Sequence, residues 1–158
     1  MSKKQKDHSP RIVNRRAHHD YEILEKIETG ISLLGSEVKS VRNGQVSLAE
    51  GFARVDPATM GLYLHDVDIA RYDHAGPRQH EPKRVRTLLA HKRQIEKLLG
   101  ATSTKGTTIV PLAMYFSRGW IKVELGLGRG KRQFDKRQDL KTREAKQQIQ
   151  RAMSRKRP

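Results

Sequence analysis

The last thirty residues of the chain contain almost nothing that could form a hydrophobic core. Residues 129–158 carry twelve Lys or Arg residues against three acids. Their apolar residues are Phe134, Leu140, Ala145, Ile149, Ala152 and Met153. Because such a segment buries too little apolar surface to offset its ordering entropy, we predict that it is intrinsically disordered when alone. Dense positive charge without a core is typical of a segment that folds against polyphosphate. The expected partner is therefore nucleic acid, in particular folded RNA.

Positive charge is concentrated at the two ends of the sequence. The 158 residues hold 33 Lys or Arg and 17 Asp or Glu, a net charge of +16. Residues 1–19 carry six basic residues and one acid, whereas residues 20–128 carry fifteen basic residues and thirteen acids. We therefore divide the chain into a basic N-terminal arm (1–19), one domain with a core (20–128) and a basic C-terminal tail (129–158). This segregation favours a polyanion-binding surface.

The composition argues against several other classes of protein. The chain has no Cys, which excludes disulfides and thiolate metal sites. No apolar run reaches the ~20 residues of a membrane span, and no apolar signal-peptide region follows the N-terminal lysines. We expect a soluble, cytoplasmic protein that uses no cofactor.

The seven histidines do not suggest a metal or catalytic site. The close His/acid clusters at 18–20 and 65–68 lack the spacing of a zinc site. The GLGRGKRQ stretch at 126–133 lacks the residue spacing of a P-loop, and no nucleophile-elbow motif is present. We expect no metal and no catalytic residue. A His-dependent nuclease is the enzymatic alternative, and it would require a divalent metal.

Alternating apolar residues predict a series of short strands. A half-buried strand is expected from Tyr21, with Gly30 permitting a bend into a second strand, and residues 52–56 and 62–65 are expected to form a hairpin. Residues 107–117 and 120–128 should form a longer hairpin, with Pro111 at an edge or a bulge. Five or six strands in a domain of this size predict a mainly β fold. The best match is an OB-type closed antiparallel β-barrel with a few added helices.

Two helices are expected within the domain. Residues 36–44 predict a short helix that is capped by Ser36 and ended by Asn43 and Gly44. From Val85 onward the apolar residues follow helical spacing until Gly100, which is expected to end the helix.

Three groups of basic residues could contact RNA. They lie at 14–16, at 83–86 together with 91–93, and in the tail. Guanidinium groups bind phosphate through paired hydrogen bonds, and the few aromatic residues favour recognition of folded RNA by shape over stacking of single strands. Glu28 is either a solvent-facing residue or an acceptor for a guanine edge or an Arg.

Four longer segments carry a resemblance to a known family. They are NRRAHHDY (14–21), EKIETGISLLGSEVKSVRNGQVSLAEGFA (25–53), KRVRTLLAHKRQI (83–95) and GKRQFDKRQDLKTRE (130–144). In their order and coverage the chain resembles the SsrA-binding protein (SmpB) family, bacterial partners of transfer-messenger RNA (tmRNA) in ribosome rescue. The resemblance implies an OB-type barrel without enzymatic activity that holds the tRNA-like domain of tmRNA. It also implies a tail that is helical on the ribosome, where it probes the decoding centre and the empty mRNA channel.

The same resemblance implies roles for individual residues. Asn14, Glu28 and Leu89 fall at positions linked to tmRNA binding, and residues 135–137 match a tail motif required for accommodation. Phe134 stands where other members can carry His. The expected RNA-binding residues are Asn14, Arg15, Arg16, Glu28, Lys39, Arg42, Lys83, Arg84, Arg86, Leu89, His91, Lys92, Arg93, Arg129, Lys131 and Arg132. The expected decoding-centre residues of the tail are Phe134, Asp135, Lys136, Arg137, Ile149 and Met153.

The partners implied by the resemblance are tmRNA and the ribosome, including small-subunit rRNA. Alanyl-tmRNA with elongation factor Tu is expected in the same assembly, with the protein bound as a monomer and no membrane involved. A generic ribosomal or rRNA-binding OB protein is the alternative binding function. It would bind rRNA tightly without a tRNA-like ligand.

Overall fold

The structure, a computed structural model, describes residues 9–155. The start of the predicted N-terminal arm (1–8) and the last basic residues of the tail (156–158) lie outside the described residues. The elements in chain order are β1 (Ile12–Val13), α1 (Arg15–Asp20), β2 (Tyr21–Ile31), α2 (Gly35–Arg42), β3 (Val46–Ser47), β4 (Phe52–Asp56), β5 (Gly61–His65), β6 (Asp68–Ile69), η1 (Gly76–Arg78), β7 (Arg86–Leu89), α3 (Lys92–Thr102), β8 (Thr107–Ser117), β9 (Trp120–Gly130) and α4 (Gln133–Arg155).

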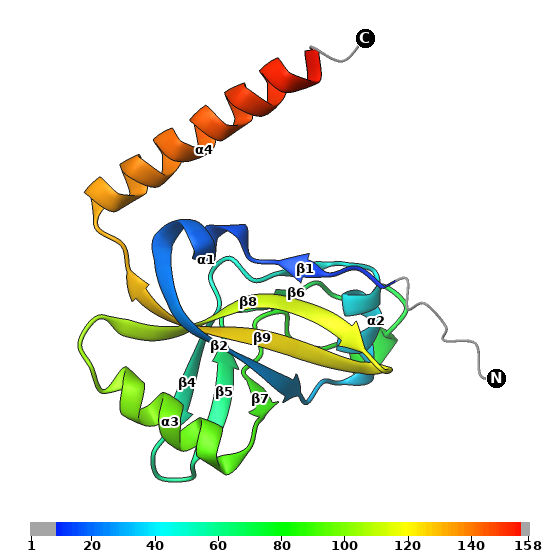
Figure 1. The fold of residues 1–158 in the computed structure, drawn as a ribbon. Helices are drawn as coiled ribbons and strands as arrows, with labels where there is room; N and C mark the ends of the chain where they lie inside the picture. The colour runs from blue at the N-terminus through cyan, green and yellow to red at the C-terminus, as the bar shows by residue number, and fades with distance from the viewer. Residues whose placement is uncertain (1–8, 156–158) are drawn as a thin grey trace, which may run out of the picture.

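Seven antiparallel strands form one sheet that closes into a ring (Figure 1). Around the ring the order is β8, β4, β5, β7, β2 and β9, and β9 pairs again with β8. The seventh strand, β1, pairs with Ala113 and Met114 of β8. β3 and β6 form a separate two-stranded sheet. The predicted antiparallel sheet is confirmed. The fold as a whole is mixed rather than mainly β, because the helices, above all α4, contribute nearly as many residues as the strands.

The core fills the inside of this ring. Alternate residues of β4, β5 and β9 point inward, as the period of two in a half-buried strand requires. The largest fully buried apolar side chains of this core are Val41, Leu62, Leu64, Val67, Ile69, Leu98, Ile109, Met114 and Leu125, while Leu112 packs with Ala17 and Val110 in a second, smaller cluster. Leu98 comes from α3 and Val41 from α2, so both helices add apolar side chains to the core of the ring.

The two predicted hairpins are confirmed. β4 and β5 pair from Phe52 opposite His65 to Asp56 opposite Gly61. β8 and β9 are joined by Arg118 and Gly119, whose φ angles of 52° and 81° are those of a two-residue turn with positive φ at both positions. The β8–β9 register shifts just after Pro111, so the predicted bulge is also present.

The helix predicted to begin at Val85 is wrong in its first half. Residues 86–89 form β7 instead, because Thr87 and Leu88 pair with β5 and Leu88 and Leu89 pair with β2. Helix α3 begins only at Lys92 and continues through Gly100 to Thr102. The predicted second strand after Gly30 is also absent from this part of the described chain. β2 runs on to Ile31, and α2 begins at Gly35 with Leu34, not Ser36, at its N-cap.

The prediction that the tail is disordered is corrected by α4, a helix of 23 residues that projects from the body (Figure 1). Residues 133–155 contain no Gly or Pro and are rich in Lys, Arg, Gln, Glu and Ala, which have high helix propensity. Asp135 in the first turn complements the positive end of the helix dipole, and Asp139 lies one turn before Arg143. The disorder prediction considered only the lack of a core, and helix propensity does not depend on a core.

Candidate nucleic-acid interface

One face of the ring brings together residues from four strands. Gly30 of β2 pairs with Leu89 of β7 on one side and with Lys122 of β9 on the other, and Lys122 pairs with Tyr115 of β8. Glu28 lies two residues before Gly30 and therefore points to the same side of β2. We call Glu28, Gly30, Leu89, Tyr115 and Lys122 the outer sheet face. It unites Glu28 and Leu89, two expected RNA-binding residues that are 61 positions apart in the sequence.

A close approach of backbones shapes this face. A Cβ atom added to Gly30 would lie 3.3 Å from the Leu89 Cβ, so a larger residue at position 30 would displace the Leu89 side chain. Leu89 itself is 58% exposed. The apolar stripe of the predicted helix would also have included Leu89, whereas the strand geometry places its side chain outside the core. Its side chain is available to a partner.

A hydrogen bond fixes the carboxylate of Glu28. The Tyr115 hydroxyl donates to Glu28 Oε2. Burial and, next, this hydrogen bond raise the pKa of Tyr115 to about 12, so the phenol stays protonated and remains a donor. Glu28 Oε1 has no hydrogen-bond partner within residues 9–155 and can accept from a nucleic-acid N–H group.

Positive charge borders the outer sheet face. The Arg11 guanidinium lies 4.5 Å from the centre of the Tyr115 ring and is 3.1 Å from Glu124 Oε2. Lys26 approaches the other oxygen of Glu124 at 3.4 Å. Our sequence interpretation missed Arg11, Tyr115 and Lys122. A two-residue turn at 118–119 already places Tyr115 opposite Lys122, so the hairpin register was the signal that could have found this pair.

Asn14, expected to bind RNA, has only 4% of its surface exposed and makes structural contacts inside the protein. Its Oδ1 accepts from the Ala17 N–H at 3.1 Å and caps α1, and its Nδ2 donates to the carbonyls of Leu48 and Pro111, both at 2.9 Å. Asn14 thus ties α1 to the body. The neighbouring Arg15 is exposed. Arg16, also exposed, pairs with Glu50 and Asp20.

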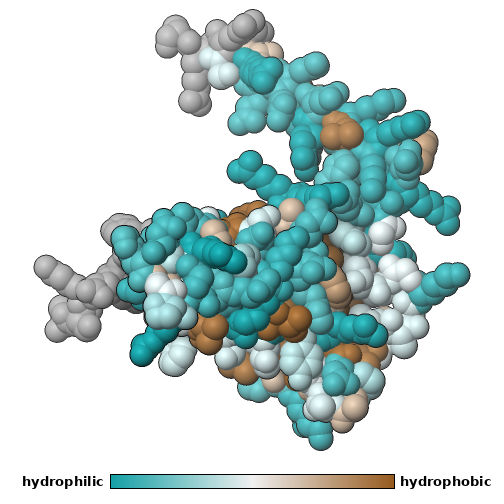
Figure 2. Space-filling view, turned by 180° about the vertical axis from the view of Figure 1, so that it is seen from behind, coloured by the Kyte–Doolittle hydropathy of each residue, from teal (hydrophilic) through white to brown (hydrophobic). Residues whose placement is uncertain are grey.

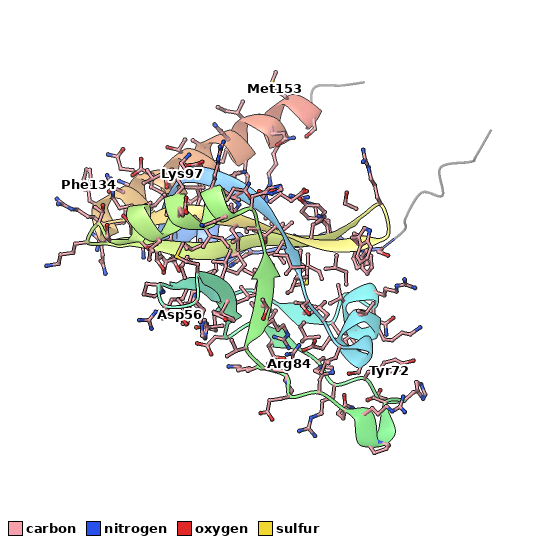
Figure 3. All side chains as sticks on the ribbon, turned by 90° about the horizontal axis from the view of Figure 1, so that it is seen from below. Asp56, Tyr72, Arg84, Lys97, Phe134 and Met153 are labelled. Atoms are coloured by element: carbon pink, nitrogen blue, oxygen red, sulfur yellow. The ribbon has the colours of Figure 1, made fainter. Side chains whose placement is uncertain are left out.

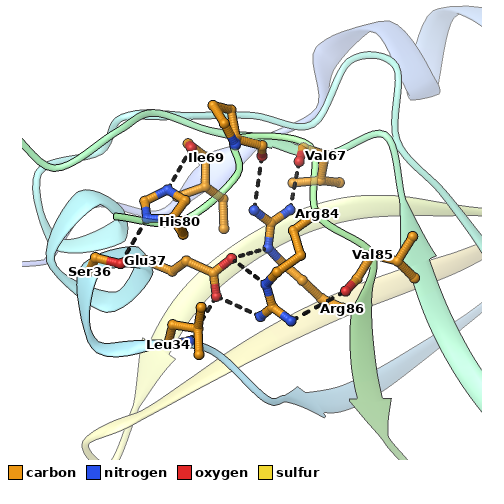
Figure 4. A network of polar contacts seen from close by, with 10 residues as sticks. Leu34, Ser36, Glu37, Val67, Ile69, His80, Arg84, Val85 and Arg86 are labelled. Carbon is orange, nitrogen blue, oxygen red and sulfur yellow. Dashed lines mark hydrogen bonds and ion pairs between the residues drawn. The ribbon is translucent and has the colours of Figure 1, made fainter. Parts of the chain in front are cut away.

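Two other residues expected to bind RNA, Arg84 and Arg86, take part in an internal network (Figure 4). Arg86 is 0% exposed, and its Nε lies 2.8 Å from Glu37 Oε1. Its other nitrogens donate to the carbonyls of Val67 (2.7 Å) and Pro82 (2.9 Å). Arg84 Nη2 donates to Glu37 Oε2 at 2.8 Å. Arg86 cannot reach an RNA without unfolding of this network.

The charge state of Glu37 follows from opposing effects. Burial raises its pKa, but hydrogen bonds from Arg84, from the Leu34 N–H and from Arg86 outweigh burial, and the pKa lies below its usual value. Glu37 is therefore ionised at neutral pH and balances the buried charge of Arg86.

The other expected basic residues of the body are exposed. They lie on α2, on the loop before β7, around the start of α3, near the end of β9 and just after it: Lys39, Arg42, Lys83, His91, Lys92, Arg93, Arg129 and Arg132. Arg42 packs over the Phe116 ring at 5.6 Å, and Lys92 lies 3.9 Å from Glu96 one turn along α3.

The tail helix is held at its base by α1. Asp20, the last residue of α1, accepts the Lys131 backbone N–H at its carbonyl (2.9 Å), and Lys136 Nζ lies 3.3 Å from Asp20 Oδ1. Lys131 also reaches the His18 carbonyl (3.3 Å) and pairs with Asp139. A hydrogen bond from His19, opposed by burial and reinforced by Lys136, lowers the pKa of Asp20. We call these contacts the tail junction.

Beyond the junction, the side chains of α4 make no ion pair with the body among residues 9–155. Figure 2 shows it as a mostly hydrophilic projection with isolated hydrophobic residues. Phe134, Ile149 and Met153 are 69%, 60% and 69% exposed, and Phe134 and Met153 mark the two ends of the helix in Figure 3. At 100° per residue, these three side chains fall within about 100° of one another around the axis. Asp135 and Arg137 are exposed next to this stripe.

Other kinds of site receive no support from the part of the chain that is described. No group of three or more His, Asp or Glu residues is placed to hold a metal ion between residues 9 and 155. In the same range no helix has the length and apolar character needed to span a bilayer.

Comparison with known proteins identifies the family. The family model for "SmpB protein" matches residues 11–155. The SsrA-binding protein of Geobacillus kaustophilus is 47% identical over 139 residues, 88% of each chain. That of Carboxydothermus hydrogenoformans is 48% identical over 140 residues, covering 89% of this chain and 93% of its own. A solved structure described as "tmRNA-SmpB: a journey to the center of the bacterial ribosome" is 48% identical, with a TM-score of 0.67 and coverage of 79% and 87%. The chain therefore belongs to the SmpB family of SsrA-binding proteins.

Proposed function

We propose that this protein binds the tRNA-like domain of tmRNA and delivers it to stalled ribosomes for trans-translation. The observation that carries the proposal is the outer sheet face, where Glu28 and the exposed Leu89 share one face of neighbouring strands in a member of the SmpB family. Glu28 offers an acceptor that Tyr115 holds in place, and Leu89 offers an apolar contact. This is a binding function, and no catalytic step is required of any residue.

The closed ring acts in this proposal as an OB-type barrel, whose strands provide a rigid RNA-binding surface. Long-range attraction comes from basic residues outside the face, through release of counterions from the RNA. The body alone carries little net charge, so we assign shape and specific contacts to the body and most of the electrostatic affinity to the basic ends.

The tail helix is proposed to enter the decoding centre and the empty mRNA channel. It arrives as a preformed helix, so it does not have to fold there, and its entry is possible only where mRNA is missing. The stripe of Phe134, Ile149 and Met153 would contact the channel, while Lys and Arg side chains face rRNA phosphates. We propose that the protein acts as a monomer in the cytoplasm, together with alanyl-tmRNA and elongation factor Tu.

Two sets of variants test this division of labour. Glu28→Gln and Leu89→Ala should each weaken binding to a labelled tRNA-like domain about tenfold, the scale expected for loss of one hydrogen bond to a charged group or one buried apolar contact. Their melting temperatures should remain close to wild type, because both side chains are exposed. Glu96→Gln, an exposed acid on α3, is the matched control and should bind normally.

The second set changes the tail. Replacing Asp135, Lys136 and Arg137 by Ala changes the net charge by only one unit, so affinity for free tmRNA should be nearly unchanged. Tagging of nascent chains on stalled ribosomes should collapse. If the triple variant tags normally, or loses RNA affinity as Glu28→Gln does, the assigned roles are wrong. If the wild-type protein bound an rRNA hairpin as tightly as the tRNA-like domain, the general rRNA-binding alternative would be favoured.

A further inference from the structure

A groove of about 650 Å³ lies between the start of α2 and the loop of residues 70–79. Leu34, Ser36 and Lys39 line one wall, and Tyr72, Ala75 and Arg78 line the other. Figure 3 shows Tyr72 on this loop next to α2. The volume is within the range of small-ligand sites, about 300–1,000 Å³. The groove belongs neither to the outer sheet face nor to the tail junction.

Hydrogen bonds hold both walls in place. Gln79 closes the loop on itself, because its Oε1 accepts from the Tyr72 N–H (3.0 Å) and its Nε2 donates to the Tyr72 carbonyl (2.8 Å). His80, which is buried, lies 2.8 Å from Ser36 Oγ on the opposite wall (Figure 4). Its Nε2 donates to the Ile69 carbonyl at 2.9 Å. The groove is therefore preformed, which lowers the entropic cost of binding.

The lining is apolar at its base and cationic at its rim. Lys39 and Arg78 are both exposed and neither takes part in an ion pair in the described structure, while no carboxylate lines the groove. The nearest acid on α2, Glu37, is buried and turned toward Arg84 and Arg86. Such a site suits a ligand with a flat apolar part and an adjacent negative charge.

The half-buried ring of Tyr72 provides the aromatic surface. Leu34, 47% exposed, lies on the other wall. Sequence-specific RNA recognition commonly uses unpaired bases that leave the stack and rest on aromatic side chains. The groove also follows directly from β2, since only residues 32–34 separate the end of that strand from α2. One folded RNA bound at the outer sheet face can thus extend into the groove.

We propose that this groove binds a single unpaired nucleotide of the structured RNA, with the base between Tyr72 and Leu34 and the phosphates at Lys39 and Arg78. The inference rests on the proposed RNA-binding function and adds a second contact to it. Its ligand class is a nucleotide in a folded RNA, recognised by stacking and by charge.

The test compares variants of the full chain for binding to the tRNA-like domain RNA. Tyr72→Ala should lower affinity roughly five- to hundredfold, the range measured for loss of one stacked base. Tyr72→Phe keeps the ring and should bind like wild type. The double variant Lys39→Gln/Arg78→Gln should weaken binding and reduce the salt slope by about 1.4–1.8. Arg71→Gln, in the same loop but not lining the groove, is the control and should leave the affinity nearly unchanged.

Chemical probing of the RNA provides a second measurement. Wild-type protein should change the backbone reactivity of one unpaired nucleotide, and Tyr72→Ala should leave that nucleotide as in free RNA. Wild-type affinity and wild-type reactivity for Tyr72→Ala would overturn the inference. The inference would also be overturned if the groove variants bound the RNA normally but associated more weakly with ribosomes, because that result would indicate a protein partner. If the wild-type chain itself does not bind this RNA, the proposed function fails instead.

Discussion

Replacing Glu37 tests whether the internal ion network holds α2 to β7. The carboxylate accepts hydrogen bonds from Arg84 Nε and Nη2, from Arg86 Nε and from the Leu34 N–H, at 2.8 to 3.2 Å. Glu37→Ala removes all four and leaves Arg86, 0% exposed, with only two carbonyl acceptors and no counterion. Breaking a buried pair in this way costs about 3–5 kcal/mol of unfolding free energy.

Glu37→Gln separates charge from shape. Glutamine retains one acceptor oxygen and the packing volume, so we expect a loss of about 2 kcal/mol, on the scale of hydrogen bonds to charged groups. The control Glu96→Gln removes an exposed i,i+4 pair with Lys92 and should cost no more than about 0.5 kcal/mol. The assay is equilibrium unfolding in urea, followed by circular dichroism, with equal slopes in all variants.

The stability difference between wild type and Glu37→Gln should change with pH in one direction. Because folding lowers the pKa of Glu37 below 4.5, its contribution is complete above that pH and is lost as the pH falls through the folded-state value. The difference in unfolding free energy between wild type and Glu37→Gln should therefore shrink only under acid conditions. The assigned role would be refuted if Glu37→Ala lowered the unfolding free energy by less than about 1 kcal/mol. It would also be refuted if wild type and Glu37→Gln became equally stable between pH 6 and 8.

Three further predictions concern the ends of the chain. Truncation after Gly130 should leave a cooperatively melting body, because no described residue of α4 is buried; a fragment without a cooperative transition would contradict this. Affinity for the tRNA-like domain should fall steeply with salt, with a log–log slope of several units at ~0.7–0.9 per phosphate, and a flat slope would exclude the electrostatic account. Asp20→Asn should broaden the distances between spin labels on the body and on α4, introduced at new cysteines since the chain has none. An unchanged distribution would show that the tail junction does not depend on this carboxylate.

Local chemistry made part of the fold predictable from sequence. The turn at Arg118 and Gly119 and the bulge at Pro111 depend on backbone preferences of single residues, and both appear where expected. The segment from Val85 to Leu89 was misassigned because its apolar spacing continues that of the helix after it, while pairing of Leu88 with β5 and β2 makes it a strand. That pairing joins strands far apart in the sequence, so a local pattern does not contain it.

The candidate site was predictable only in part for a related reason. Basic residues were assigned to the surface by their type, but Arg86 finds a buried counterion 49 positions away in Glu37. Asn14 was also assigned to RNA contact, and in the structure its Oδ1 caps α1, a role that depends on the fold around it. The family resemblance assigned both Glu28 and Leu89 to RNA binding. Their position on one face stays invisible until the register of β2 and β7 is known.

The tail junction makes α4 a lever arm. At 1.5 Å per residue the 23-residue helix is about 35 Å long, and its ion pair with the body, between Lys136 and Asp20, lies in its first turn. A rotation of about 10° at the base displaces the far end by about 6 Å, more than the width of one side chain. Small changes at Asp20, such as screening of its ion pair with Lys136 by salt, are thus amplified at Met153. The direction of α4, as distinct from its affinity for a partner, is therefore set at the tail junction.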